Sequence, residues 1–380
     1  MTRQNTRALM LSTDAKILDA DSAVQARMQS YGTLFEKLTI LVLGVGERQV
    51  FELSSNVRVV FPGGASKKEA YSNAFLEGMR EGRALAPHAP EKNTDNLVVS
   101  TQDPFFLGFA GWRIARALHV SLQTQIHTDA FNPHYFLSSI RKFIEVFIAF
   151  FVIAQATRVR VVSKRIAKSL WFVNKEKITV LPIHDTSIED VEVASKRPTA
   201  YNPEHPVILM VSRLEPEKRI HVALEAMVHV PEAHLYIAGS GSRENLLKKR
   251  ARNLGIASRV HFLGWQKDLA SYYEHADIFL QLSRFEGYGM TLIDAGLARL
   301  PIVTTDVGVV GEVYEKQHDV LVVRPLPYVI ARALSGLLAD PNARVLMGGR
   351  ARKKAHSVLM EKEAYKKAYQ QAFTDCLNQQ

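Results

Sequence analysis

The segment "ADIFLQLSRFEGYGMTLIDAG", residues 276–296, runs from an apolar stretch through a loop with two glycines into a helical pattern. Its first part, "ADIFLQLS", is typical of a buried strand, and the residues after Gly289 are typical of a helix. Gly287 and Gly289 allow a tight turn and a close approach of the backbone to a ligand. A strand that leads through such a loop into a helix is the unit of parallel α/β sheets, where ligands bind beyond the carboxyl ends of the strands.

Similar apolar, β-branched runs alternate with helical patterns along the whole chain. In the first half the runs are "ALMLST", "LTILVLG", "VRVVFPG", "NLVVST", "SLQTQIH", "VRVVS" and "ITVLPI". Helical patterns lie between them at 21–36, 66–83 and 104–118. In the second half the runs are "VILMVS", "AHLYIAG", "VHFLG", "ADIFLQLS", "PIVTTD" and "DVLVVRP", with helical patterns at 217–229, 242–254, 266–275, 289–299, 328–339 and 342–357. This alternation predicts parallel sheets with helices on both faces.

A polar stretch separates the two series. "HDTSIEDVEVASKRPTAYNPEHP", residues 184–206, contains three prolines and no sustained period, apart from a strand candidate in "VEVA". We therefore predict an α/β protein of two Rossmann-like, doubly wound domains, 1–195 and 196–360, with a ligand cleft between them. A final helix in 361–380 would pack its apolar stripe back on the first domain; the stripe consists of Tyr365, Tyr369, Phe373 and Leu377.

The composition is that of a globular protein with a basic surface. The 380 residues are 47% hydrophobic and 23% charged, and the formal net charge is +10. This charge favours anionic partners such as nucleotides or acidic lipids, although it also fits good solubility alone. Cys376 is the only cysteine, which excludes an intrachain disulfide and fits a cytoplasmic protein.

Neither a membrane span nor a metal signature is evident. The first apolar run, "ALML", is too short for a signal peptide, and no apolar stretch reaches the roughly 18–20 residues of a spanning helix. The thirteen histidines form no HxxxH or HExxH pair, so we predict no metal site.

The opening segment has the chemistry of an anion site. A helix that begins near Met290 presents N–H groups without intrahelical partners, and these suit a diphosphate. Glu286 on the loop would face the group that is joined to the diphosphate. Asp294, about one turn inside the helix, could accept hydrogen bonds from a ribose. The alternative is a plain glycine turn with an exposed aspartate.

A second segment, "VSRLEPEKR" at 211–219, follows the first strand of the second domain. It places Arg213 and Lys218 at the same end of the sheet as Glu286, where two cations would neutralise a leaving diphosphate. A solvated charged loop is the alternative. The two segments together, in this order within one domain, favour the binding site.

In these segments the sequence resembles glycosyltransferase family 4, whose members have the GT-B fold. "SRLEPEKR" is similar to the family's "GRL-x-x-x-K-G" segment, and "EGYGMTLIDA" is similar to its E-x7-E motif. "AHLYIAGSGSREN", "VHFLGW" and "PIVTTDVGVVGEV" also fall in the family's order. The resemblance is dense from about residue 206 to 325 and thin in the first domain. It implies a retaining, metal-independent transferase that needs no cofactor and uses a UDP- or GDP-type sugar donor.

The resemblance also implies roles for individual residues. Arg213 and Lys218 would bind the nucleotide diphosphate, and Glu286 would bind hydroxyls of the donor sugar. Asp294 would bind the ribose, in place of a glutamate that is longer by one methylene. The rest of the donor site would be Gly287, Tyr288, Gly289, Met290, Thr291 and Leu292.

The first domain offers fewer candidates. His127 ends the run "SLQTQIH", and Asp129 follows two residues later. The resemblance implies that His127 lines the cleft beside the donor sugar, where a neutral imidazole could orient the acceptor hydroxyl or the anomeric centre. The alternative is a histidine that is satisfied at a strand end. Ser22 and Ala23 are placed on the acceptor side by position alone, because the glycine-rich loop common there in the family is missing.

The catalytic residues would then be His127, Arg213, Lys218 and Glu286. No carboxylate pair is evident for the double displacement that retaining glycosidases use. We therefore expect the acceptor to attack from the face that the diphosphate leaves, with domain closure excluding water.

The segment "IRKFIEVFIAFFVIAQATRVRVVSKRIAK", residues 140–168, has an apolar centre with basic flanks. Its centre is too short to span a bilayer and fits either a buried helix of the first domain or an interfacial helix. In the second case the protein would lie peripherally on the inner face of the cell membrane, and the acceptor would be lipid-linked or a surface glycan precursor.

Two other functions remain open at this point. A GT-B-fold epimerase would act on the nucleotide sugar itself. A nucleic-acid-binding protein would fit the net charge of +10, but the sequence has no nucleic-acid-reading motif and no platform of interleaved aromatic and basic residues. We therefore expect no nucleic-acid partner.

Overall fold

The computed structural model describes residues 6–87, 96–183 and 196–378. The chain divides into two compact units: unit 1 is Met1–Pro182 with Met360–Gln380, and unit 2 is Ile183–Leu359. Unit 1 thus ends before residue 195, where the sequence analysis places the boundary, and it includes the C-terminal segment. The strand candidate "VEVA" lies outside the described residues.

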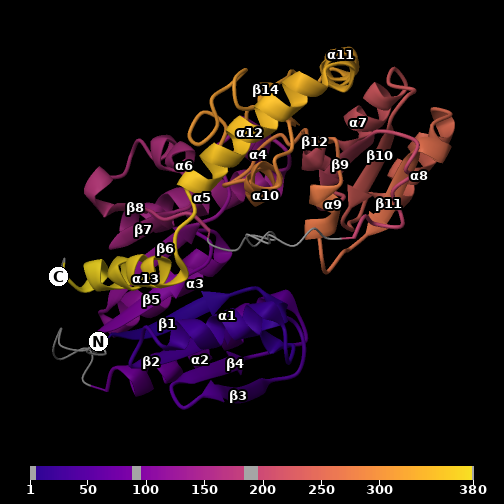
Figure 1. Cartoon of the computed structure of the whole chain (residues 1–380). Helices are drawn as coiled ribbons and strands as arrows, with labels where there is room; N and C mark the ends of the chain where they lie inside the picture. Colours follow the sequence, from indigo (N-terminus) through magenta and orange to yellow (C-terminus); the bar gives the residue numbers. More distant parts are fainter. Residues whose placement is uncertain (1–5, 88–95, 184–195, 379–380) are drawn as a thin grey trace. The chain divides into compact units, whose positions relative to one another are not determined.

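Unit 1 is built on one sheet whose strands follow the order β3-β4-β2-β1-β5-β6-β7-β8 (Figure 1). Every neighbouring pair is parallel except β3 and β4, which are antiparallel. The strands are β1 (Arg7–Ser12), β2 (Lys37–Val42), β3 (Gln49–Ser54), β4 (Val57–Phe61), β5 (Leu97–Thr101), β6 (Ser121–Ile126), β7 (Arg158–Val161) and β8 (Ile178–Val180).

All seven apolar runs predicted in the first half form strands, and the prediction missed β3. Strands β5 and β6 are buried along their whole length, as expected for parallel strands covered on both faces. β3, "QVFELS", is an edge strand of half-buried and exposed residues. Its polar composition hides it from a search for continuous apolar runs.

Helices cover the sheet of unit 1. They are α1 (Ala23–Gly32), α2 (Lys67–Leu85), α3 (Phe106–Leu118), α4 (Pro133–Phe136), α5 (Ile140–Gln155), α6 (Lys164–Ser169) and α13 (Lys362–Leu377). Two short 3-10 helices are η1 (Ala15–Leu18) and η2 (Lys175–Lys177).

The C-terminal helix α13 packs its aromatic stripe into the core of unit 1. Tyr369 stacks on Tyr31 with ring centroids 4.6 Å apart, and Phe373 meets Phe35 edge to face at 4.9 Å. The Gln123 side chain on β6 donates to the Ala372 carbonyl at 2.8 Å. These contacts bind the end of the chain to the sheet formed by its first half.

Helix α5 is not buried on all sides, which rules out that alternative of the sequence analysis. Glu145, Ala149, Val152 and Ile153 face the interior. The opposite side is exposed and largely apolar; we call its large apolar residues the α5 face, which consists of Ile140, Phe143, Ile144, Phe147, Phe150 and Phe151. No helix within the described residues has the length and apolar character needed to cross a bilayer.

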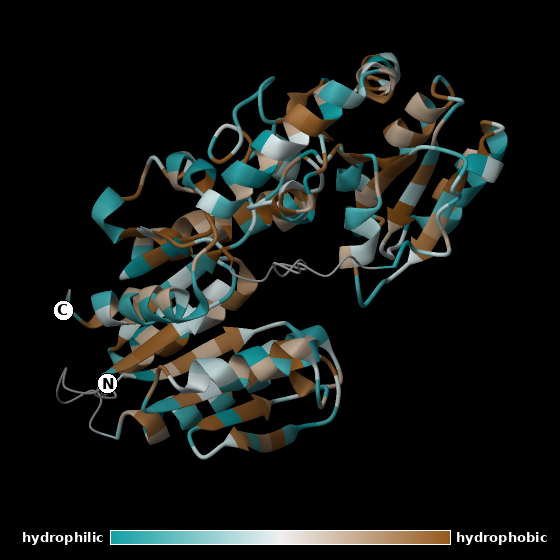
Figure 2. Ribbon diagram, in the orientation of Figure 1, coloured by the Kyte–Doolittle hydropathy of each residue, from teal (hydrophilic) through white to brown (hydrophobic). Residues whose placement is uncertain are grey.

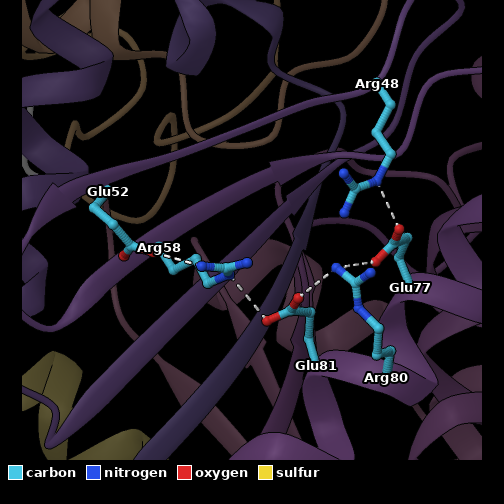
Figure 3. Close-up of polar contacts among 6 residues, drawn as sticks. All are labelled: Arg48, Glu52, Arg58, Glu77, Arg80 and Glu81. Atoms are coloured by element: carbon cyan, nitrogen blue, oxygen red, sulfur yellow. Dashed lines mark hydrogen bonds and ion pairs between the residues drawn. The ribbon is translucent and has the colours of Figure 1, made fainter.

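An ion-pair network joins β3 and β4 to α2 at the edge of unit 1 (Figure 3). Glu81 on α2 pairs with Arg58 at 3.2 Å and with Arg80 at 3.0 Å. Arg80 and Arg48 both reach Glu77, at 2.7 and 2.8 Å, and Arg58 reaches Glu52 at 2.6 Å. Cations and carboxylates alternate, so each charge in the network has an opposite neighbour.

Unit 2 is built on a second, fully parallel sheet with strand order β11-β10-β9-β12-β13-β14 (Figure 1). Its strands are β9 (Val207–Val211), β10 (His234–Ala238), β11 (Val260–Gly264), β12 (Ile278–Gln281), β13 (Ile302–Thr304) and β14 (Leu321–Val322). Its helices are η3 (Pro216–Lys218), α7 (Ile220–Met227), α8 (Glu244–Asn253), η4 (Ala257–Arg259), α9 (Ala270–Glu274), α10 (Met290–Leu297), α11 (Pro327–Ala339) and α12 (Pro341–Ser357).

The core of unit 2 lies between this sheet and its helices. Apolar residues of β9, β10 and β12 meet those of α7, α8 and α11 in one buried cluster. The strands of both sheets are largely brown in Figure 2, whereas many helices alternate between teal and brown. The six strands and six helices predicted for the second half are all present, which confirms two α/β domains with parallel sheets.

Candidate functional site

The candidate site of unit 2 forms where two adjacent parallel strands end. β9 and β12 pair in the middle of the sheet, so the loops after them begin side by side. The first loop contains η3 and carries Arg213 and Lys218. The second loop contains Glu286 and leads into α10. The Arg284 amide donates to the Glu217 carbonyl at 2.8 Å and links the two loops.

Lys218 and Glu286 meet in this site. The Lys218 ammonium lies 2.5 Å from Oε1 of Glu286, and both side chains are mostly enclosed, at 14% and 17% exposure. The sequence analysis expected the two residues at one end of the sheet. The structure brings them into direct contact across 68 positions of the chain.

Two further side chains orient the Glu286 carboxylate. Ser283 Oγ donates to Oε1 at 2.7 Å, and Gln281 Nε2 donates to the same oxygen at 3.3 Å. Thr291 at the head of α10 donates to Gln281 Oε1 at 2.6 Å and so fixes the amide. Among the described residues no donor reaches Oε2 of Glu286, which leaves that oxygen able to accept from a ligand hydroxyl.

Helix α10 is preceded by a backbone conformation that glycine adopts much more readily than other residues. Gly289 precedes it with a φ of +91°, in the left-handed region. This turn points the first N–H groups of α10, at Met290 and Thr291, away from the helix body, where they have no intrahelical acceptor. They form a site of partial positive charge beside Lys218 and Glu286.

The loop after β13 supports Tyr288 from the other side. Val309 donates its amide to the Tyr288 carbonyl at 2.8 Å. Gly308 has a φ of +55°, and a Cβ atom there would lie 2.2 Å from the same carbonyl oxygen. The backbone of "EGYG" is therefore held by a close approach that a larger residue at 308 would prevent.

Arg213 lies on the same loop as Lys218 but outside the enclosed cluster. Its guanidinium donates to Glu217 at 2.9 Å, and its side chain is 72% exposed. An exposed pair of this kind contributes little to stability. Arg213 is therefore free of packing constraints that would hold it away from an anion on the loop.

Asp294 is placed on the buried side of α10. Its side chain is almost fully enclosed, and its charge helps to raise the pKa of the neighbouring Tyr273, after burial, which is the larger cause. The alternative in the sequence analysis was a glycine turn followed by an exposed aspartate. The burial of Asp294 excludes an exposed aspartate. The assignment of Asp294 to a ribose stays a prediction.

His127 in unit 1 follows β6 and is partly buried. Its Nε2 lies 3.3 Å from Gln125 Oε1. Burial, followed by the charges of Arg160 and Arg27, lowers the pKa of His127 to about 3. The imidazole is therefore neutral at physiological pH. Asp129 nearby is buried, and burial raises the pKa of its carboxyl.

Ser22 and Ala23 serve the local fold of unit 1. Ser22 Oγ accepts from the Gln25 amide at 3.0 Å and donates to the Lys16 carbonyl at 2.5 Å, so it caps α1. Ala23 is the first residue of that helix. The Ser22 hydroxyl thus donates one hydrogen bond and accepts another within unit 1.

The sequence analysis missed Gln281, Ser283 and Thr305. Thr305 Oγ1 donates to the Ser283 carbonyl at 2.7 Å and thereby holds the loop that presents Ser283 to Glu286. All three are polar residues at the ends of otherwise apolar strands, and that is the signal that could have identified them.

One group of possible metal ligands occurs within the described residues. Glu315, His318 and Asp319 each offer an atom within 4.8 Å of the others, and two of the three residues are exposed. Surface groups of this kind are common without an ion, and we assign no metal to it.

Comparisons with known proteins relate unit 2 to a family of glycosyl transferases. The family described as "Glycosyl transferases group 1" matches residues 193–354, which contain the whole candidate site. Among curated proteins, the lipopolysaccharide core biosynthesis glycosyltransferase LpsE of Rhizobium meliloti is 28% identical over 170 residues. That match covers 44% of this chain and 49% of LpsE, so the chain aligns with about half the length of this relative.

Solved structures match nearly the whole chain. Sucrose-phosphate synthase from Thermosynechococcus elongatus superposes with a TM-score of 0.76 at 18% identity, covering 97% of this chain and 99% of that one. Anabaena HepE in complex with UDP and glucose gives 0.70 at 15% identity, covering 93% and 95%. The two α/β domains with parallel sheets are therefore those of GT-B glycosyltransferase structures.

Proposed function

We propose that the protein is a retaining glycosyltransferase of family 4, which transfers a sugar from a nucleoside diphosphate sugar to a hydroxyl acceptor. The observation that carries this proposal is the contact between Lys218 and Glu286 at the head of α10. It joins a cation, a carboxylate with one available oxygen and a helix N-terminus, which together suit a sugar diphosphate. The match of residues 193–354 to a glycosyltransferase family supports the same chemistry.

Donor binding would rearrange the charges of this site. Without donor, Lys218 neutralises Glu286. A diphosphate would attract the ammonium of Lys218 and, from the exposed side of the loop, the guanidinium of Arg213. The free N–H groups of Met290 and Thr291 would bind phosphate oxygens, and the neighbouring loop residues Gly287, Tyr288, Gly289 and Leu292 would line the donor. Asp294 would accept from the ribose.

The sugar would be bound through Glu286. Ser283 and Gln281 hold its Oε1, so that Oε2 could accept from a sugar hydroxyl without a change in the carboxylate plane. Such preorganisation lowers the barrier when the same contact strengthens as the sugar becomes oxocarbenium-like in the transition state.

The reaction would proceed by front-face transfer and needs no metal or further cofactor. The bond between the anomeric carbon and the diphosphate oxygen breaks, and its electron pair leaves with the nucleoside diphosphate. The acceptor oxygen forms the new bond on the same face of the ring, which retains the anomeric configuration. The acceptor proton passes to the departing phosphate oxygen, whose charge Lys218 and Arg213 stabilise.

His127 is proposed to orient the acceptor hydroxyl. Because its pKa is lowered to about 3, the imidazole is neutral and cannot serve as a general acid near neutral pH. A neutral ring can still accept a hydrogen bond from a hydroxyl or donate one. Asp129 is proposed to lie on the acceptor side as well. For Ser22 and Ala23 the cap of α1 is the better-supported role.

The acceptor is proposed to be a glycan precursor that is lipid-linked or destined for the cell surface. LpsE acts in lipopolysaccharide core biosynthesis, according to its name. The exposed α5 face and its basic flanks support a peripheral position on the inner face of the cell membrane.

Nucleotide binding and product analysis test this function. Thermal unfolding with UDP, GDP and an RNA oligonucleotide should show a rise in Tm with one nucleoside diphosphate only; at a hundredfold excess over Kd the stabilisation is about 2.7 kcal/mol. With a panel of UDP and GDP sugars, NMR should then show a product that keeps the anomeric configuration of the donor. An epimerised nucleotide sugar, or a shift with RNA alone, would contradict the proposal.

A further inference from the structure

The α5 face continues beyond its own helix. Leu137, just before α5, and Trp171, just after α6, are 72% and 84% exposed, and Ile140 and Phe147 within the face are 82% and 63% exposed. Residues 140, 143, 144, 147, 150 and 151 repeat at helical spacing. The helix thus departs from the usual amphipathic pattern, because its solvent side carries large apolar residues in addition to the apolar residues of its buried side.

Aromatic contacts order two parts of this surface, which adjoin along α5. Phe150 stacks on Phe172 with centroids 4.2 Å apart, and Trp171 meets Phe172 edge to face at 5.8 Å. Phe143 and Phe147 meet at 5.0 Å. These contacts hold the side chains in place on the surface, so they form a continuous apolar area. Areas of this kind mark protein or membrane interaction sites.

The inner side of α5 prevents the helix from turning this surface inward. Glu145 is buried and receives the Tyr135 hydroxyl at 3.1 Å and Arg141 Nε at 2.8 Å. A rotation that buried Phe147 would carry the Glu145 carboxylate toward solvent and break its contact with Tyr135. The exposure of the α5 face is therefore a stable property of the fold of unit 1.

The charges around the face are almost all positive. The segment 137–175 contains one acidic residue, the buried Glu145, and eight basic ones: the buried Arg160, and Arg141, Lys142, Arg158, Lys164, Arg165, Lys168 and Lys175. Lys168 and Lys175 are close to Trp171 in the sequence and are exposed, and the exposed Glu176 follows them. Two copies that met through this face would bring like charges together, which disfavours self-association and favours an anionic partner.

We propose that the α5 face docks on an anionic bilayer surface. Phe147, Trp171 and their neighbours enter the boundary between headgroups and acyl chains, where aromatic side chains are favoured. Lys168 and Lys175 then contact lipid phosphates, and their alkyl stems lie along the apolar surface. This inference rests on the proposed function for its meaning, since it gives that function a lipid-linked acceptor, but the docking itself is tested without any sugar donor.

Vesicle sedimentation of the full chain tests the apolar contribution. The protein should sediment with phosphatidylcholine vesicles that contain phosphatidylglycerol and much less with phosphatidylcholine alone. Replacing both Phe147 and Trp171 by serine should weaken the binding at least about tenfold. The matched control is the double change of Val345 and Leu346 to serine, which removes two exposed apolar residues from α12 and should leave binding unchanged.

A second pair of variants tests the charges. Lys168→Glu with Lys175→Glu should weaken binding about tenfold or more and reduce its sensitivity to salt. Lys249→Glu with Lys353→Glu changes the net charge equally on exposed positions of α8 and α12 and should have a much smaller effect. Equal effects of the two pairs would show nonspecific attraction by net charge and would overturn the proposal.

Tryptophan fluorescence identifies the inserted residue. The chain has three tryptophans, and Trp112 packs against Phe151 of the α5 face, so Trp112→Phe is combined with each change. In Trp112→Phe with Trp265→Phe, vesicles should shift the emission to shorter wavelength, and lipids brominated on the acyl chain should quench it. In Trp112→Phe with Trp171→Phe both signals should be lost, although Trp265 is also exposed. Absence of vesicle binding, or a dimer that only the Phe147 and Trp171 changes dissociate, would overturn the proposal. Either result would leave the test with UDP and GDP untouched, so failure of docking and failure of the proposed function are distinguishable.

Discussion

Two charged clusters, one in each unit, differ in whether their polar groups are all paired with one another or partly available to a ligand. The network of Arg48, Arg58, Arg80 and three glutamates in unit 1 alternates in sign and links two strands to one helix (Figure 3). The cluster of unit 2 is smaller, with Lys218 and Glu286 set among neutral donors at the head of α10. The first cluster satisfies its own charges, whereas the second leaves one carboxylate oxygen and two helix amides to a ligand.

The strongest way to break this comparison is to change one glutamate in each cluster. Glu286→Gln should reduce transfer by at least about a hundredfold, because the amide no longer stabilises positive charge that develops on the sugar. The fold should survive, since Gln keeps the shape of the side chain. Initial rates with the identified donor measure the loss, and thermal unfolding checks the fold.

The matched control is Glu52→Gln at the exposed end of the network in unit 1. It should leave both transfer and Tm close to the original. If Glu286→Gln turned over at a rate close to that of the unmodified protein, the role proposed for this carboxylate would be wrong. The cluster of unit 2 would then differ from that of unit 1 in its contacts but not in a role in transfer.

Lys218 and Arg213 test the same contrast within one loop. Lys218→Met should weaken binding of the nucleoside diphosphate by about tenfold to a hundredfold, as expected for a charge-assisted hydrogen bond. Arg213→Met should weaken it less, because water screens a contact between the exposed Arg213 and a phosphate more than a contact made by the enclosed Lys218. Calorimetric titration with UDP or GDP gives both dissociation constants. Equal losses would mean that the enclosure of Lys218 is irrelevant to the donor.

The network of unit 1 should respond in stability and not in binding. Glu81 is nearly buried and receives both Arg58 and Arg80. Glu81→Gln should therefore lower the free energy of unfolding by about 1–3 kcal/mol, since the enclosed carboxylate that accepts from two guanidinium groups is replaced by an amide whose NH2 group cannot accept. Denaturant unfolding measures the loss, and the affinity for the nucleoside diphosphate should not change. Glu52→Gln, at an exposed pair, should lose less than about 0.5 kcal/mol.

The sequence revealed one of these clusters and not the other, for a physical reason. Lys218 and Glu286 lie in loops that follow strands, and the carboxyl ends of parallel strands meet at one edge, so their approach was predictable. Arg48 lies just before β3, and it meets Glu77 because β3 joins the sheet by pairing antiparallel with β4. That pairing was not predicted, because β3 has no continuous apolar run.

The sequence predicted which helices and strands are present better than it predicted the directions in which their side chains point. The apolar pattern of residues 140–155 predicts a helix, but it cannot say which side the sheet covers, and the buried position of Glu145 is visible only in the structure. The carboxylate of Glu286 was expected to face a ligand. Its fixation by Gln281 and Ser283 depends on side-chain directions in a loop, which no periodicity encodes.

His127 of unit 1 extends the comparison of the two clusters to a titratable group that the folded protein keeps neutral. The pKa of His127 is lowered to about 3, so the folded state holds it neutral while the unfolded chain takes up a proton near pH 6.5. Above pH 6.5 the ring is neutral in both states and does not affect stability, and the folded state loses stability as the pH drops from 6.5 toward 3. Between pH 6.5 and 5.5 the loss is about 1 kcal/mol.

Replacing His127 with glutamine should remove this dependence. The Tm of the variant should fall less steeply with acidification between pH 6.5 and 5.5 than that of the original protein. His134→Gln, at an exposed histidine, should leave the slope unchanged. Parallel curves for His127→Gln and the original protein would show that unit 1 tolerates a proton on this ring. The imidazole could then act as an acid near neutral pH, and the orienting role proposed for its neutral form would have to be abandoned.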